Sequence, residues 1–176
     1  MKIAIITDTH FGARNDSVQF DEYFYQESSA KGHGVRGKDV VPLLSCSIRK
    51  EMLKVLSYLR SHYKQLCLTN NIKTGIGAGM SSTQKEAVAT EKAMSVFNYI
   101  IESSKVGFRK PEKEIYELAC ERLAMPCEQI VYLDDLGINL KPARAMGMKT
   151  IKVRSERQAI ADLGNILELD LVALTK

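Results

Sequence analysis

Short apolar runs alternate along the chain with stretches whose apolar residues recur at helical spacing. The apolar runs cover residues 3–6, 66–68, 130–133 and 150–153, with a shorter apolar patch at 99–101. Helical spacing is found at 48–60, 83–97, from Pro111 onward, at 139–146 and at 158–163. A short continuous apolar run is typical of a strand buried on both faces, and strands separated by helices form parallel sheets. We therefore predict an α/β domain with a doubly wound parallel sheet.

Local signals place the ends of two of these helices. Thr83 and Glu86 have the spacing of a capping box, which predicts a helix start. Asn139 is a candidate N-cap of a short helix that Gly147 ends. Residues 12–47 do not follow the alternation, so we expect an irregular insert there within a single domain of residues 1–176.

Composition and charge narrow the functional classes. The 176 residues are 45% hydrophobic and 26% charged, which is ordinary for a globular protein. The 25 basic and 21 acidic residues give a net charge of +4, and the basic residues are scattered, so we do not expect a nucleic-acid partner. No apolar run approaches the ~18 residues of a membrane span, and the first residues read as a strand, not a signal peptide. We expect a cytoplasmic protein.

The four cysteines are not arranged in a recognisable metal or redox motif. Cys46, Cys67, Cys120 and Cys127 form no pair separated by two residues. We therefore predict reduced thiols, with neither a disulfide nor a zinc site.

Polar residues follow three of the predicted strands. Asp8, Thr69 and the pair Asp134 and Asp135 each come at the end of an apolar run. Because the carboxyl ends of parallel strands meet at one edge of the sheet, we expect these side chains to converge there. Carboxylates suit Mg²⁺, and a hydroxyl with backbone N–H groups suits phosphate. The sequence predicts a site for both at this edge.

Three segments carry a resemblance to a known family. They are LCLTNN at 66–71, ESSKVGFRKPEKEIYELACERL at 102–123 and IVYLDDLGINLKPARAMGMKTIKV at 130–153. In this order they resemble the haloacid dehalogenase-like (HAD) hydrolase superfamily, most closely the phosphatase domain of soluble epoxide hydrolase and acyl-CoA-dehydrogenase-linked relatives. The resemblance covers about residues 40–171. It implies a HAD-like Rossmannoid core and Mg²⁺-dependent hydrolysis of a small phosphorylated substrate.

The resemblance also implies roles for residues that bind the phosphoryl group. Thr69 would bind its oxygens with Asn70 beside it, and Lys110 would neutralise the charge of the nucleophile and the phosphate. These roles agree with the chemistry, because phosphoryl transfer depends on positioning and on charge neutralisation.

A second group of roles concerns the nucleophile and the metal. Asp8 would attack phosphorus and contribute to the Mg²⁺ site, Asp135 would ligate the ion with Asp134 in support, and Asn139 would organise the acidic loop. The first HAD motif is Asp-x-Asp, whereas this chain has His10 at the position of the second Asp. Histidine is able to shuttle protons near neutral pH, so we predict that His10 serves as the acid–base group.

The beginning of the chain resembles a different family. Residues 1–26 are similar to the start of calcineurin-like metallophosphoesterases, in which Asp8 and His10 would both be metal ligands. The change of resemblance between 26 and 40 indicates a junction, and a natural fusion, an assembly chimera and a remodelled first HAD motif all fit it. About sixty residues separate Asp8 from Thr69, which predicts a shortened or rudimentary helical cap in residues 12–47.

Three functions follow from these patterns. The first is a HAD-like hydrolase that cleaves phosphomonoesters through a phospho-aspartyl intermediate on Asp8. The second is a catalytically impaired HAD-like binding module, motivated by His10. The third is a metallophosphoesterase or nuclease fragment, which rests on residues 1–26 alone.

Overall fold

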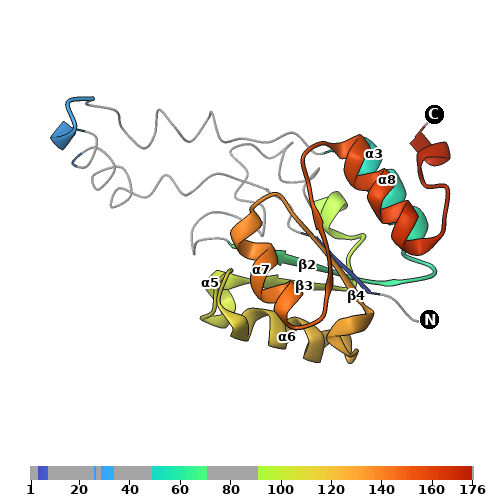
Figure 1. The fold of residues 1–176 in the computed structure, drawn as a ribbon, viewed down its shortest axis with the longest axis horizontal. Coiled ribbons are helices and arrows are strands. Elements are labelled where there is room, and N and C mark those ends of the chain that lie inside the picture. Colours follow the sequence, from blue (N-terminus) through green and yellow to red (C-terminus); the bar gives the residue numbers. More distant parts are fainter. Residues whose placement is uncertain (1–3, 8–25, 27–28, 34–48, 71–90, 176) are drawn as a thin grey trace.

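A computed structural model describes residues 4–7, 26, 29–33, 49–70 and 91–175 (Figure 1). Its strands are β1 (Ala4–Thr7), β2 (Lys64–Thr69), β3 (Tyr99–Glu102), β4 (Ile130–Asp134) and β5 (Lys149–Lys152). Its labelled helices are α3 (Lys50–Leu59), α5 (Ser103–Val106), α6 (Lys113–Leu123), α7 (Gly137–Ala145) and α8 (Glu156–Leu167), with 3-10 turns η2 (Cys127–Gln129) and η3 (Val172–Thr175).

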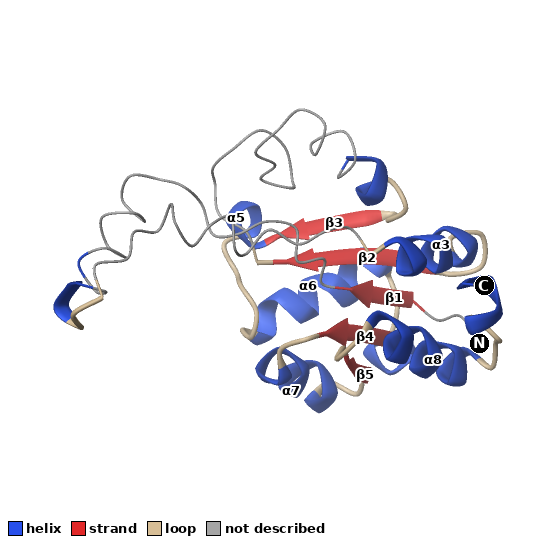
Figure 2. Cartoon of the chain, turned by 90° about the horizontal axis from the view of Figure 1, so that it is seen from above, coloured by secondary structure: helices blue, strands red, loops and turns tan. Residues whose placement is uncertain are grey.

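The strands form one parallel sheet in the order β3-β2-β1-β4-β5 (Figure 2). In the register of the sheet, Thr7 at the end of β1 lies between Cys67 of β2 and Leu133 of β4. The chain order reverses at β1, because β2 and β3 extend the sheet on one side and β4 and β5 on the other. In open α/β sheets, the carboxyl edge at such a reversal is where ligands bind.

Helices cover both faces of the sheet. One apolar cluster joins α3 and α8 to one face, and a second joins α6 and α7 to the other face (Figure 1). The sequence of β4 is continuously apolar because both of its faces are buried. Val131 and Leu133 belong to the first cluster, and Ile130 and Tyr132 belong to the second. This arrangement confirms the predicted doubly wound parallel sheet.

The predicted elements agree with the structure except at their ends. The helix expected over 83–97 lies partly outside the described residues, as does its capping box, and residues 91–94 are helical. The structure corrects the start of α7, which begins at Gly137, so that Asn139 lies inside the helix instead of capping it. Most of the irregular segment 12–47 also lies outside the described residues.

The cysteine prediction was wrong for one pair. Cys120 near the end of α6 and Cys127 at the start of η2 form a disulfide, with Cα atoms 5.8 Å apart. Ala124 adopts a left-handed conformation (φ 49°) after α6, and the chain turns there, so that residues seven apart in sequence come into contact. The sequence prediction considered cysteines in closely spaced motifs and missed this turn. Cys67 is buried and free, and Cys46 lies outside the described residues.

Within the described part of the chain, the helices lack the length and apolar character that crossing a membrane requires.

Candidate active site

The candidate site lies at the carboxyl edge of the sheet, where β2 and β4 end on either side of β1. Thr69 is the last residue of β2 and is 7% exposed, and Asp134 is the last residue of β4 and is buried. Asp8 follows Thr7 directly in the chain, but Asp8 and His10 lie outside the described residues. The structure therefore places two of the three predicted strand-end positions at one edge.

Lys110 comes from the turn between α5 and α6. Gly107 ends α5 in a left-handed conformation (φ 82°), which a residue with a side chain rarely adopts. The turn is then closed by Glu112, whose backbone N–H donates to Arg109 O at 2.7 Å and whose carboxylate accepts from Arg109 N at 3.1 Å. These contacts turn the chain back toward the sheet at Lys110.

Asn70 connects this turn to the end of β2. Its Nδ2 donates to Lys110 O at 3.0 Å, and its Oδ1 accepts from Lys110 N at 2.8 Å. The side chain of Asn70 thus holds both backbone polar groups of Lys110. The predicted place of Asn70 beside a phosphoryl group stays a prediction, whereas its contact with the backbone of Lys110 is shown by the structure.

Lys110 and Asp134 form a buried ion pair. Lys110 Nζ lies 3.0 Å from Asp134 Oδ2, and the exposed fractions of the two side chains are 1% and 0%. Burying two charges costs several kcal/mol for each ion unless hydrogen bonds satisfy them. The pair therefore depends on the other donors around Asp134.

The carboxylate of Asp134 accepts hydrogen bonds from several protein groups. Oδ1 accepts from Leu136 N at 2.7 Å, and Asn139 Nδ2 lies 3.1 Å from both oxygens. The hydroxyl of Tyr132 also donates to Oδ2. The side chain of Asn139 contacts Asp134 instead of capping α7, and its predicted role in organising the acidic loop stays a prediction.

Two buried tyrosines lie beneath this ion pair, and sequence reasoning missed the one that contacts it, Tyr132. Tyr132 and Tyr116 meet edge to face, with ring centroids 5.7 Å apart. The hydroxyl of Tyr116 donates to Asn139 O at 2.7 Å. The signal for Tyr132 was its position two residues before Asp134, because alternate residues of a strand lie on the same face of the sheet.

A second missed residue is Glu102, the last residue of β3. It is buried, it pairs in register with Thr69, and its carboxylate forms an ion pair with Lys105 of α5. Glu102 thus adds a buried acid to the same edge of the sheet.

Asp135 is the residue of this edge whose chemistry bears on Mg²⁺ binding. Asp135 is exposed and directly follows Asp134, whose oxygens are already engaged by protein donors. Among the described residues there is no cluster of three or more metal-binding side chains. Mg²⁺ usually keeps several waters and takes one or two protein carboxylates, so the carboxylate of Asp135 is of the kind that this ion takes.

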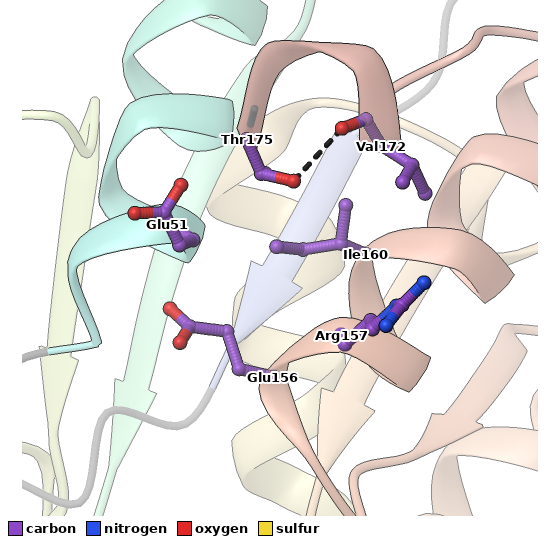
Figure 3. A pocket seen from close by; sticks show the side chains of 6 residues that line it. All are labelled: Glu51, Glu156, Arg157, Ile160, Val172 and Thr175. Atoms are coloured by element: carbon purple, nitrogen blue, oxygen red, sulfur yellow. Dashed lines mark hydrogen bonds between the residues drawn. The ribbon is translucent and has the colours of Figure 1, made fainter.

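A separate pocket lies on the α3 and α8 face of the molecule. It has a volume of about 360 Å³ and is lined by Glu51, Glu156, Arg157, Ile160, Val172 and Thr175 (Figure 3). None of these residues belongs to the candidate site. Glu156 has a structural partner there, because its Oε1 accepts from Met52 N at 2.8 Å.

Comparison with known proteins identifies relatives of this chain. Bifunctional epoxide hydrolase 2 from Rattus norvegicus is 34% identical over 124 residues, which are 68% of this chain and 21% of that protein. Acyl-CoA dehydrogenase family member 10 from Mus musculus is 31% identical over 121 residues, which are 68% of this chain and 10% of that protein. This chain therefore corresponds to a small part of each relative.

Solved structures share the fold. A predicted HAD-like family hydrolase from Porphyromonas gingivalis has a TM-score of 0.61 at 17% identity, covering 95% of this chain and 98% of that one. A HAD family enzyme from Bacteroides thetaiotaomicron, in complex with magnesium and inorganic phosphate, has a TM-score of 0.59 at 16% identity, covering 89% and 96%.

The resemblance drawn from the three sequence motifs is confirmed by the family match. Residues 28–153 match the model of the haloacid dehalogenase-like hydrolases. The resemblance of residues 1–26 to metallophosphoesterases and the junction between 26 and 40 stay predictions. Because the family model matches more than half of the chain, this chain belongs to the haloacid dehalogenase-like hydrolase family.

Proposed function

We propose that this chain hydrolyses phosphate monoesters with Mg²⁺ through a phospho-aspartyl intermediate on Asp8. The observation that carries the proposal is the buried ion pair between Lys110 and Asp134 at the carboxyl edge of the sheet. A buried charged pair is a poor source of stability, because hydrophobic residues of similar volume often serve as well or better. A cation held at a ligand-binding edge is instead suited to neutralise an anion.

Phosphoryl transfer needs the charge of the phosphate to be neutralised in a fixed geometry. The two hydrogen bonds with Asn70 fix the backbone of Lys110, and the contact with Asp134 fixes its ammonium group. Thr69 lies next to Asn70 in the chain, where its hydroxyl is able to donate to a phosphoryl oxygen. Thr69, Asn70 and Lys110 form our proposed phosphate site.

The proposed reaction has two displacements at phosphorus. The carboxylate of Asp8 attacks phosphorus, the ester P–O bond breaks, and the leaving alcohol takes a proton from His10. A water molecule then attacks phosphorus of the acyl phosphate, giving its proton to His10 and releasing inorganic phosphate and the Asp8 carboxylate.

Magnesium would be held by Asp135 and Asp8 at this edge. When bound, it supplies positive charge that stabilises the charge developing on the phosphoryl oxygens. We assign Asp134 a supporting role, because its oxygens accept hydrogen bonds from Lys110, Leu136 and Asn139. The magnesium and inorganic phosphate bound to the HAD family enzyme from Bacteroides thetaiotaomicron support the choice of these two ligands.

Release of inorganic phosphate from a generic aryl phosphate tests the proposal. We expect activity that requires Mg²⁺, is abolished by Asp8→Asn, and falls at least about a hundredfold in Lys110→Met, the scale for losing one charge-stabilising group. Lys113→Met is the matched control, because Lys113 lies on the exposed side of α6 and pairs with Glu117.

Two results would contradict the proposed function. Activity that survives Asp8→Asn would exclude the phospho-aspartyl route. Binding of phosphate and Mg²⁺ without turnover over a broad panel of esters would instead identify a non-catalytic HAD-like module, which His10 in the first motif favours as the second candidate.

A further inference from the structure

The Tyr132 hydroxyl and the Lys110 ammonium contact the same oxygen of Asp134. Both groups donate to Oδ2, and Asn139 Nδ2 lies 3.1 Å from that oxygen as well. Tyr132 and Asp134 are two residues apart on β4, so the strand places both on the side of the sheet that α6 and α7 cover. The contact is therefore built into the strand that ends at the site.

We propose that Tyr132 is a positioning residue that sets the place of the Lys110 ammonium through Asp134. This inference rests on the proposed function, because it assigns Lys110 to the phosphoryl group. An ammonium in a buried site is drawn strongly toward a carboxylate such as that of Asp134, since the local dielectric is low. A second donor on the same oxygen shares its negative charge and weakens that attraction.

The hydroxyl of Tyr132 also restricts the orientation of the carboxylate. Leu136 N holds Oδ1 from the loop after β4, while Tyr132 holds Oδ2 from the core beneath it. With both oxygens held, Asp134 does not rotate to follow the ammonium. Lys110 then stays directed toward the edge of the sheet where the phosphoryl group would bind.

The alternative is that Tyr132 merely fills the core and satisfies a buried hydroxyl. Tyr116 provides a matched control for this alternative. Both tyrosines are fully buried, their rings are in contact, and the hydroxyl of each donates a hydrogen bond. The acceptor of Tyr116 is the backbone carbonyl of Asn139, whereas the acceptor of Tyr132 belongs to the ion pair.

The experiment compares Tyr132→Phe with Tyr116→Phe in the full chain. Inorganic phosphate binding is measured by calorimetry with Mg²⁺ present, and kcat and KM are measured with an aryl phosphate. We expect Tyr132→Phe to weaken phosphate binding and to lower kcat/KM by about tenfold, the effect of losing one hydrogen bond to a charged group. Tyr116→Phe is expected to change both by less than about twofold, with a similar shift of the urea midpoint in the two variants.

A double variant tests whether Tyr132 acts through Lys110. In a Lys110→Met background, Tyr132→Phe is expected to produce no further loss of phosphate affinity, because the ammonium that it positions is gone. Equal phosphate affinities in Tyr132→Phe and Tyr116→Phe would overturn the inference. Additive losses in the double variant would also overturn it.

The outcomes separate this inference from the proposed hydrolysis. If the wild-type chain binds phosphate without hydrolysing esters, and Tyr132→Phe alone weakens that binding, hydrolysis is excluded and the role of Tyr132 stands. If the wild-type chain hydrolyses esters and the two variants behave alike, hydrolysis stands and the inference falls. A wild-type chain that neither binds phosphate nor hydrolyses esters would overturn both.

Discussion

Asn70 and Lys110 are joined by two reciprocal hydrogen bonds between a side chain and a backbone. Asn70 Nδ2 donates to Lys110 O at 3.0 Å, and Lys110 N donates to Asn70 Oδ1 at 2.8 Å. This pair connects the end of β2 to the turn that carries the buried lysine. The position of the ammonium therefore depends on a residue forty positions earlier in the chain.

Replacing Asn70 by alanine is expected to release this turn. We predict a fall in kcat/KM for phosphate ester hydrolysis of about tenfold to a hundredfold, because a displacement of about 1 Å in a catalytic group has effects of that size. Steady-state kinetics with an aryl phosphate measures it.

Asn98→Ala is the control for Asn70→Ala. Asn98 precedes β3, and its side chain accepts from Gln65 N near the start of β2, at 2.8 Å. It thus makes a comparable contact at the opposite end of the same strand, away from Lys110. Equal kinetics in the two alanine variants would contradict the positioning role of Asn70.

Asp135→Asn is expected to weaken Mg²⁺ binding, and so to raise the Mg²⁺ concentration that the activity requires. Loss of residues that merely orient metal ligands costs about 10- to 100-fold in metal affinity, so losing a ligand is expected to cost at least tenfold. The measurement is the Mg²⁺ concentration that gives half-maximal activity, together with direct calorimetric binding of Mg²⁺.

Glu128→Gln removes a negative charge at the other end of β4 and serves as the control for Asp135→Asn. Glu128 is exposed in η2, before the first residue of the strand. Its substitution is expected to leave the Mg²⁺ requirement unchanged. An unaltered Mg²⁺ requirement in Asp135→Asn would remove Asp135 from the proposed metal site.

Much of the fold could be predicted because buried parallel strands leave a strong sequence signal. Strand β4 has apolar residues on both faces, so its run of apolar residues is continuous and ends at Asp134. The convergence of strand-end residues at one edge follows from a parallel sheet alone. That is why Thr69 and Asp134 were found without any knowledge of their contacts.

The features that the sequence did not predict depend on side-chain contacts and turns of the folded chain, which local sequence patterns do not show. Asn139 is of a residue type that often caps helices, yet its amide contacts Asp134 because α7 begins two residues earlier. Tyr132 lies in an apolar run and is identified as core, although its hydroxyl contacts a carboxylate. The pairing of Cys120 with Cys127 depends on a left-handed turn at Ala124, for which alanine gives no signal.

Reduction of the Cys120–Cys127 disulfide is expected to lower the thermal stability of the chain. The bond closes a loop between residues seven apart, and loop-closure entropy assigns such a bond roughly 2 to 3 kcal/mol. For a chain of this size that corresponds to a decrease in Tm of about 5 to 10 °C.

Thermal unfolding with and without reductant measures this effect. The double variant Cys120→Ser/Cys127→Ser is expected to have a Tm close to that of the reduced wild-type chain, with or without reductant. A wild-type Tm that reductant does not change would contradict a stabilising disulfide.

Glu156 of α8 is expected to stabilise the start of α3. The residue before α3 is Arg49, whose side chain has no acceptor, and Glu156 Oε1 accepts from Met52 N instead. Loss of a helix cap costs about 1 kcal/mol, so Glu156→Ala is expected to lower Tm by about 2 to 4 °C.

Arg157→Ala is the control for Glu156→Ala, because Arg157 is the next residue of α8 and lines the same pocket. Its substitution is expected to change Tm by less than about 1 °C, the effect of an ordinary surface change. A smaller loss in Glu156→Ala than in Arg157→Ala would show that the contact with Met52 does not stabilise α3.

Two glycine substitutions are expected to have different effects on stability. A Cβ on Gly164 in α8 would lie 2.6 Å from the backbone oxygen of Leu169, whereas a Cβ on Gly137 in α7 would have Lys152 Nζ as its nearest atom, at 3.7 Å. Alanine favours a helix over glycine by up to about 1 kcal/mol. In Gly164→Ala that gain is outweighed, because the backbone after α8 must move.

We predict that Gly164→Ala lowers the free energy of unfolding by about 1 to 3 kcal/mol, the usual cost of overpacking. Gly137→Ala is expected to leave it unchanged or raise it by up to about 1 kcal/mol. Urea unfolding of both variants measures the two effects under the same conditions. If Gly164→Ala were as stable as Gly137→Ala, the close approach of Leu169 to α8 would not be a fixed feature of the fold, because the chain would accommodate a methyl group there without cost.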